Sequence, residues 1–90
     1  MPRFNIDGYR TDPGQKEVHV NDVKRLEHSH KAFVNLVLML TGGGLTAKNT
    51  ADAMALNQTL VDLPVGGSHT HKRTDHKGVK RRVVFTKVEA

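Results

Sequence analysis

The segment from Asn21 to Gly44, NDVKRLEHSHKAFVNLVLMLTGGG, decides the predicted fold. Asn21 is a favourable helix N-cap, and the glycine run that begins at Gly42 supplies a C-terminal cap. Between them, side chains recur at spacings of three and four, the period of one helix face: Val23, Leu26, His30, Phe33, Val37 and Leu40. The pattern predicts one long helix over residues 21–44.

The second half of this helix is apolar on almost every side. A helix of that kind must be enclosed all round, and one thin sheet with one short neighbouring helix cannot enclose it. We therefore expect this segment to contact other protein subunits, of this chain or of another, as well as the core. The predicted subunit-contact residues are Phe33, Leu36, Val37, Leu38, Met39 and Leu40.

A second helix is predicted from Thr46 or Thr50 to about Leu63, because Pro64 forbids continuation. Its apolar stripe consists of Ala53, Leu56, Leu60 and Leu63. The short glycine connection favours an antiparallel pair of helices. The predicted fold class is therefore α+β, with a helical hairpin (residues 21–64) packed on a small antiparallel sheet.

Residues 1–20 are expected to supply N-terminal strands to that sheet. Asp7-Gly8 is a dipeptide typical of hairpin turns, and Asp12-Pro13-Gly14 is a second turn signal. Residues 15–20 then alternate between polar and apolar side chains, as a half-buried strand does.

Residues 65–90 are expected to form a basic β-hairpin tail of the same single domain. Asp75 and Gly78 occupy the first and fourth positions of a type I turn, and residues 79–88 are rich in β-branched side chains. With this turn, Thr74 pairs with Val79, and Lys72 pairs with Arg81. The register places like charges opposite each other, which is unfavourable unless an anion neutralises them.

The tail also carries the net charge. Residues 1–67 contain seven Lys or Arg and seven Asp or Glu, whereas residues 68–90 contain seven and two. Such asymmetry favours a polyanionic partner, either the phosphate backbone of nucleic acid or an acidic protein surface. The alternative is a solvated sheet edge whose charges prevent the addition of another strand. The predicted anion-binding residues are Lys72, Arg73, Lys77, Lys80, Arg81 and Arg82.

Histidines offer a weaker hypothesis. His69, His71 and His76 carry nitrogen ligands that suit Zn²⁺, but the neighbouring lysines and arginines would repel a cation. We therefore favour polar or phosphate-facing histidines, and we expect no metal and no cofactor.

No motif indicates catalysis. Ser68, His69 and Asp75 lie close in sequence, but adjacent strand residues point to opposite faces, so Ser68 and His69 cannot act as nucleophile and base there. The run from Gly42 to Gly44 lacks the spacing of a phosphate loop and follows a predicted helix. We expect a protein without enzymatic activity and without catalytic residues.

The amino-acid composition and the N-terminal sequence limit the classes of fold and the cellular locations that are expected. The chain has 90 residues, no Cys and no Trp, so it has neither a disulfide scaffold nor much aromatic core. Its start lacks the apolar stretch of a signal peptide, and its longest apolar run is too short to span a bilayer. We expect a virion or intracellular location.

These features favour a structural subunit of a large nucleic-acid-containing assembly, such as a small viral (phage) virion or capsid protein. The apolar helix would make subunit contacts, and the basic hairpin would face nucleic acid or an acidic neighbour. The alternative is a free dimeric DNA- or RNA-binding regulator that uses the basic hairpin as a β-ribbon reader.

Overall fold

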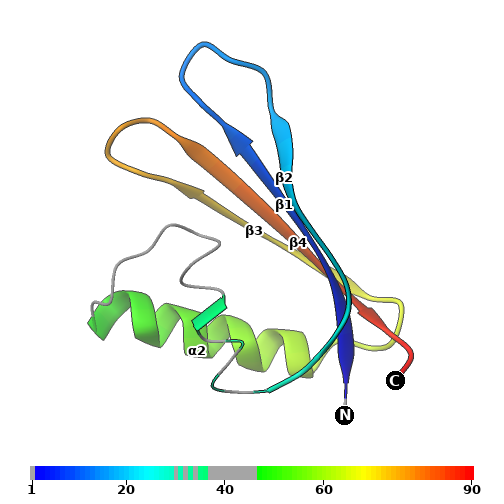
Figure 1. Cartoon of the computed structure of the whole chain (residues 1–90). Helices are drawn as coiled ribbons and strands as arrows, with labels where there is room; N and C mark the ends of the chain where they lie inside the picture. The colour runs from blue at the N-terminus through cyan, green and yellow to red at the C-terminus, as the bar shows by residue number, and fades with distance from the viewer. Residues whose placement is uncertain (1, 30, 32, 34, 37–46) are drawn as a thin grey trace.

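The computed structural model describes residues 2–29, 31, 33, 35–36 and 47–90. Its elements are β1 (Arg3–Thr11), β2 (Val18–Glu27), α2 (Ala47–Val61), β3 (Ser68–Thr74) and β4 (Lys80–Val88). The four strands form one antiparallel sheet in the order β2-β1-β4-β3. Figure 1 shows α2 lying along one face of this sheet. We call that face the inner face and the opposite one the outer face.

The predicted helical hairpin is wrong. Asn21 to Glu27, the first third of the predicted long helix, belongs to strand β2. The described residues are mostly strand, and they contain no helical hairpin. Lys31, Phe33, Asn35 and Leu36 do have helical backbone conformation, and residues 37–44 of the prediction lie outside the described part.

A β-bulge explains why β2 has the sequence spacing of a helix. Val23 pairs with Ile6 and Leu26 with Phe4, so residues three apart on β2 face residues two apart on β1. The extra residue is accommodated at Arg25, which has a positive φ of 52° and donates its backbone N–H to Asn5 Oδ1 (2.9 Å). A bulge of this kind returns both apolar side chains to one face.

Asp7-Gly8 is not a turn, because β1 continues through it. Gly8 pairs with Asn21, and a Cβ at Gly8 would lie 2.7 Å from Asn21 Oδ1. Glycine is therefore needed for close approach of the Asn21 side chain. Asn21 performs this role instead of the predicted helix cap. The turn predicted at Asp12 is present, and the N–H of Gln15 donates to the carbonyl oxygen of Asp12 (2.9 Å).

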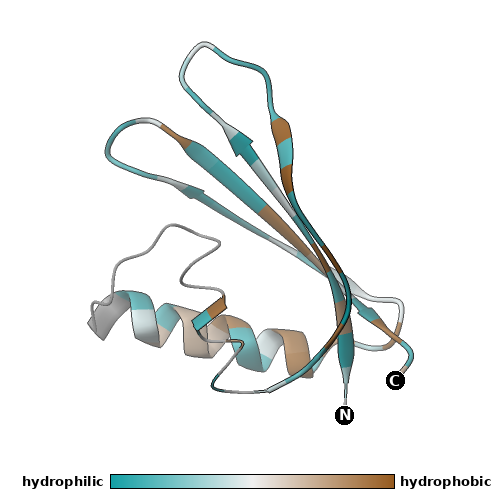
Figure 2. Cartoon of the chain, in the orientation of Figure 1, coloured by the Kyte–Doolittle hydropathy of each residue, from teal (hydrophilic) through white to brown (hydrophobic). Residues whose placement is uncertain are grey.

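The second predicted helix is confirmed as α2. Three members of its predicted stripe, Ala53, Leu56 and Leu60, are buried, and Leu63 packs partly buried against them. They meet the apolar side chains of the inner face of the sheet. The buried cluster consists of Phe4, Ile6, Phe33, Ala53, Leu56, Leu60, Val83 and Phe85. In Figure 2 apolar segments lie on β2, β4 and α2, whereas β3 is hydrophilic.

Lys87, on β4, links the C-terminal end of α2 to the sheet through hydrogen bonds. Its ammonium group donates to the carbonyl oxygens of Val61 (2.7 Å) and Leu63 (2.8 Å). The last carbonyls of a helix lack intrahelical partners and carry partial negative charge, so a cation stabilises them. The backbone of Lys87 also pairs with Gly66 and Gly67 just beyond the helix.

Lys87→Met is expected to lower the free energy of unfolding by about 2 kcal/mol, because two charge-assisted hydrogen bonds to part-buried carbonyls are lost. Chemical denaturation of the two proteins measures the difference. Lys16→Met, at an exposed lysine of the β1–β2 connection, is the control and should change the value little. Equal effects of the two substitutions would contradict the capping role.

A candidate polyanion-binding site

All the net charge of the protein lies at the turn end of the β3–β4 hairpin. Residues 72–82 contain six Lys or Arg and one Asp, whereas the rest of the chain contains eight of each sign. These eleven residues therefore hold the whole net charge of +5. We call them the basic end.

A tight connection shapes the basic end. The N–H of Gly78 donates to the carbonyl oxygen of Asp75 (3.1 Å), and Gly78 has a positive φ of 82°. This is a type I turn followed by a left-handed glycine, a common hairpin connection. Asp75 Oδ1 accepts from the backbone N–H groups of Lys77 (2.8 Å) and Val79 (3.0 Å). Burial raises the pKa of Asp75, but the two hydrogen bonds lower it more, so the pKa lies below its ordinary value.

The hairpin register differs by one residue from the predicted one. Lys72 pairs with Arg82 rather than with Arg81, because the left-handed glycine adds a residue to the connection. Paired residues share a face and neighbours along a strand alternate. The basic side chains are therefore divided between the two faces. Lys72, Lys80 and Arg82 lie on the outer face, and Arg73 and Arg81 lie on the inner face.

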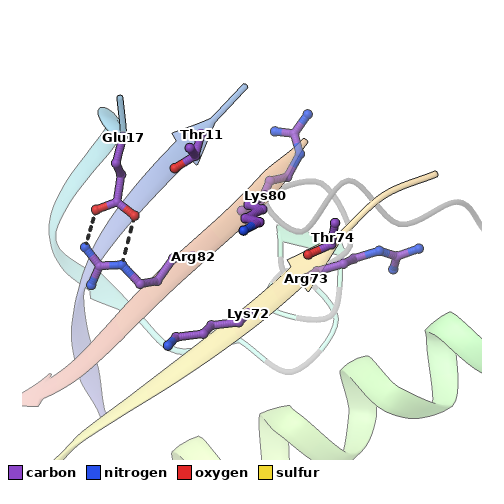
Figure 3. Close-up of a pocket in the computed structure, with 8 residues that line it drawn as sticks. Thr11, Glu17, Lys72, Arg73, Thr74, Lys80 and Arg82 are labelled. Atoms are coloured by element: carbon purple, nitrogen blue, oxygen red, sulfur yellow. Dashed lines mark hydrogen bonds and ion pairs between the residues drawn. The ribbon is translucent and has the colours of Figure 1, made fainter. Parts of the chain in front are cut away.

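A cavity of about 460 Å³ lies at the basic end. Figure 3 shows its lining, which comes from β1, the β1–β2 connection, β3 and β4. The lining residues are Thr11, Glu17, Lys72, Arg73, Thr74, Lys80, Arg81 and Arg82. It thus brings together five of the six predicted anion-binding residues. Lys77 lies in the exposed turn and does not line it.

Arg82 forms an ion pair and a ring contact at this cavity. It donates to Glu17 from Nη2 (2.7 Å) and Nε (3.2 Å), and its guanidinium lies 4.0 Å from the centre of the Tyr9 ring. The hydrogen bond from Arg82 lowers the pKa of Glu17, and the same bond raises the pKa of Arg82. A guanidinium that binds both oxygens of a carboxylate also has the geometry to bind a phosphate.

The histidine candidates are separated. His69 and His71 share the inner face of β3, opposite Phe85 and Val83, whereas His76 lies in the exposed turn. Among the described residues no group of three or more His, Asp or Glu side chains is placed to hold a metal ion. Burial lowers the pKa of His71, and electrostatic interactions with His69 and Arg73 lower it further.

A lowered histidine pKa makes stability depend on pH. His71 takes up a proton less readily in the folded protein than in the unfolded chain, so stability falls as pH drops below about 6.5, the ordinary histidine pKa. We expect the melting temperature to decrease between pH 7.5 and pH 5.5, and His71→Gln to reduce that decrease. His76→Gln is the control. An identical pH profile for wild type and His71→Gln would contradict this role.

Two of the predicted subunit-contact residues lie within the described part. Phe33 is 1% exposed and packs against Phe4, with ring centroids 5.3 Å apart. Leu36 is partly buried against the same core. Val37, Leu38, Met39 and Leu40 lie outside the described residues. Their role in subunit contacts stays a prediction.

Sequence reasoning missed the partners that β1 and the β1–β2 connection contribute to the site. Glu17, Tyr9 and Thr11 are distant from the basic end in sequence, and only the pairing of β1 with β4 places them beside it. The alternation of Tyr9 and Thr11 along one strand was the available signal. Their position beside Arg82 and Lys80 depends on the β1–β4 register, which the sequence alone does not predict.

None of the helices that the structure describes is long and apolar enough to cross a membrane. No protein-family model, no curated protein and no solved structure matches this chain, so the geometry of the basic end is the basis for assigning a function.

Proposed function

We propose that this protein is a non-enzymatic subunit of a large nucleic-acid-containing assembly, such as a virus particle, and that its basic end binds the phosphate backbone of the nucleic acid. The observation that supports this proposal is the concentration of the entire net charge around one cavity. A surface of one sign attracts the opposite charge, and phosphate contacts from Lys and Arg supply affinity without reading sequence.

Uncompensated repulsion across the hairpin strengthens the proposal. Lys72 is opposite Arg82, and Arg73 is opposite Arg81. Directly opposed like charges destabilise a sheet. Among the five lysines and arginines of the cavity, the recorded acidic partner is Glu17, which binds Arg82. Bound phosphates would neutralise the remaining charges and remove that repulsion.

Base stacking is a poor fit to this site. Of the four aromatic residues in the chain, Phe4, Phe33 and Phe85 are buried in the core. Tyr9 already stacks on His19, with centroids 4.8 Å apart, and it is also covered by Arg82. Proteins that bind bases of single strands use open aromatic faces. We therefore expect contacts to the backbone and little dependence on base sequence.

Sequence independence provides the test. Fluorescence anisotropy with labelled 20-base-pair duplexes of unrelated sequence should give dissociation constants that agree within about threefold, since backbone contacts carry no sequence information. A preference above about a hundredfold for one sequence would favour a regulator instead. No binding to any duplex at 50 mM salt would contradict the proposal.

Glu17→Gln is expected to tighten binding to a duplex about tenfold at 0.1 M salt, because one phosphate contact by Arg82 no longer has to displace a carboxylate. The pair is largely exposed, so thermal stability should change little. Anisotropy titration measures the affinity. Glu27→Gln, at the far end of β2, is the control with the same charge change. Equal gains for both variants would show a general charge effect and no competition at Arg82.

A further inference from the structure

The basic end presents cations on both faces of the sheet. On the inner face Arg10 pairs with Arg81, which pairs with Arg73, so three guanidinium groups form a row across β1, β4 and β3. We call these residues the arginine row. On the outer face the corresponding side chains are Lys72, Lys80 and Arg82, which we call the outer set. Figure 3 shows Arg73 extending away from Lys72 and Arg82.

Two of the three arginines in the row form no ion pair within the described part of the chain. Arg10 Nε lies 2.9 Å from Asp12 Oδ1. Arg73 has only a neutral partner among the recorded contacts, Asn49 Oδ1, at 3.4 Å. Arg81 Nε is buried and has no hydrogen-bond partner among the residues that the structure describes. A buried donor without a partner is rare in folded proteins and requires an explanation, and a bound anion or water would supply one.

Few carboxylates of the chain itself are near the arginine row. No acidic residue occurs between Glu27 and Asp52, so the whole segment that connects β2 to α2 is free of carboxylates. Asp75 lies near Arg81, but its Oδ1 already accepts from two backbone N–H groups of the turn. Arg73 and Arg81 can therefore take an anion from outside the chain.

The two faces meet at β3, the edge strand of the sheet. Side chains alternate along β3, so Lys72 belongs to the outer set and Arg73 to the arginine row. Cations on opposite faces of one sheet cannot both reach a single phosphate strand lying on either face. The major groove of a duplex is about 12 Å wide, admits a two-stranded β-ribbon, and has phosphates along both walls.

We infer that the ligand of the basic end is double-stranded nucleic acid, which the β3 edge enters so that the outer set contacts the phosphates of one strand and the arginine row those of the other. This inference rests on the proposed phosphate binding and specifies that the nucleic acid is double-stranded. A single strand would satisfy one face only and leave the other uncompensated.

Anisotropy measurements on a 20-base-pair duplex and on the corresponding single strand test this inference. The wild type should bind the duplex at least about tenfold more tightly than the single strand, because a second set of contacts is made. Arg73→Gln with Arg81→Gln should remove most of this preference while changing single-strand affinity less than about threefold. Charge-retaining Arg73→Lys with Arg81→Lys should preserve the preference.

Folding of each variant is checked by thermal melting, and removal of the opposed pair Arg73–Arg81 should not lower the melting temperature. Arg3→Gln with Lys24→Gln is the matched control, two charges removed from the other end of the sheet. Equal wild-type affinity for duplex and single strand would overturn the inference and leave the proposed function standing. So would an unchanged duplex preference in the double Gln variant. Absence of binding to both ligands would overturn both.

Discussion

Phe33→Ala is expected to lower the free energy of unfolding by about 3–5 kcal/mol, the usual cost of truncating a fully buried phenylalanine. Phe33 is 1% exposed, and its ring lies 5.3 Å from that of Phe4 and 4.7 Å from that of His28, measured between centroids. A domain of this size has a total stability of only about 5–15 kcal/mol. The variant should therefore unfold at much lower denaturant concentration, as circular dichroism will measure.

The same substitution separates a core role from a subunit contact. A core residue changes the midpoint of unfolding at every protein concentration, whereas a residue buried only between subunits changes it in a concentration-dependent way. Met54→Ala, at a side chain of α2 that is 48% exposed, is the control and should have little effect. A stability for Phe33→Ala within error of the wild type would contradict the packing described above.

Neutralising the five cavity-lining cations is expected to weaken duplex binding about a thousandfold or more at 0.1 M salt, because each lost phosphate contact removes roughly one released counterion. The variant replaces Lys72, Arg73, Lys80, Arg81 and Arg82 by Gln. Its fold should persist, since the change also removes the two like-charged cross-strand pairs. Anisotropy titration measures the affinity, and thermal melting checks the fold.

A charge-matched variant controls for net charge alone. Its five Gln substitutions lie outside the basic end, at Arg3, Lys16, Lys24, Arg25 and Lys31. It carries the same net charge as the test variant but keeps the basic end intact, so it should retain most of the wild-type affinity. If both variants lost affinity equally, binding would depend on total charge and the basic end would not be a site.

Local signals in the sequence located α2 and the C-terminal hairpin. Pro64 ends the helical stripe of α2, and Asp75 with Gly78 marks the hairpin connection. Both features depend on residues within a few positions of each other. The clustering of the cations at residues 72–82 was likewise visible from charge counting alone.

The features that were not predicted depend on pairing between residues far apart in the sequence. The bulge at Arg25 gives Val23 and Leu26 a helical spacing, and only their pairing with Ile6 and Phe4 shows that they belong to a strand. One additional residue in the β3–β4 connection moves Arg81 and Arg82 to opposite faces from those expected. The Glu17–Arg82 pair joins residues 65 positions apart.

The salt dependence of wild-type binding to a duplex of arbitrary sequence tests the account most directly. Five phosphate contacts predict that the logarithm of the association constant falls against the logarithm of salt concentration with a slope of about −4 to −5. A slope shallower than about −1 would show that the basic end makes no more than one such contact, and would contradict its role as a phosphate-binding site.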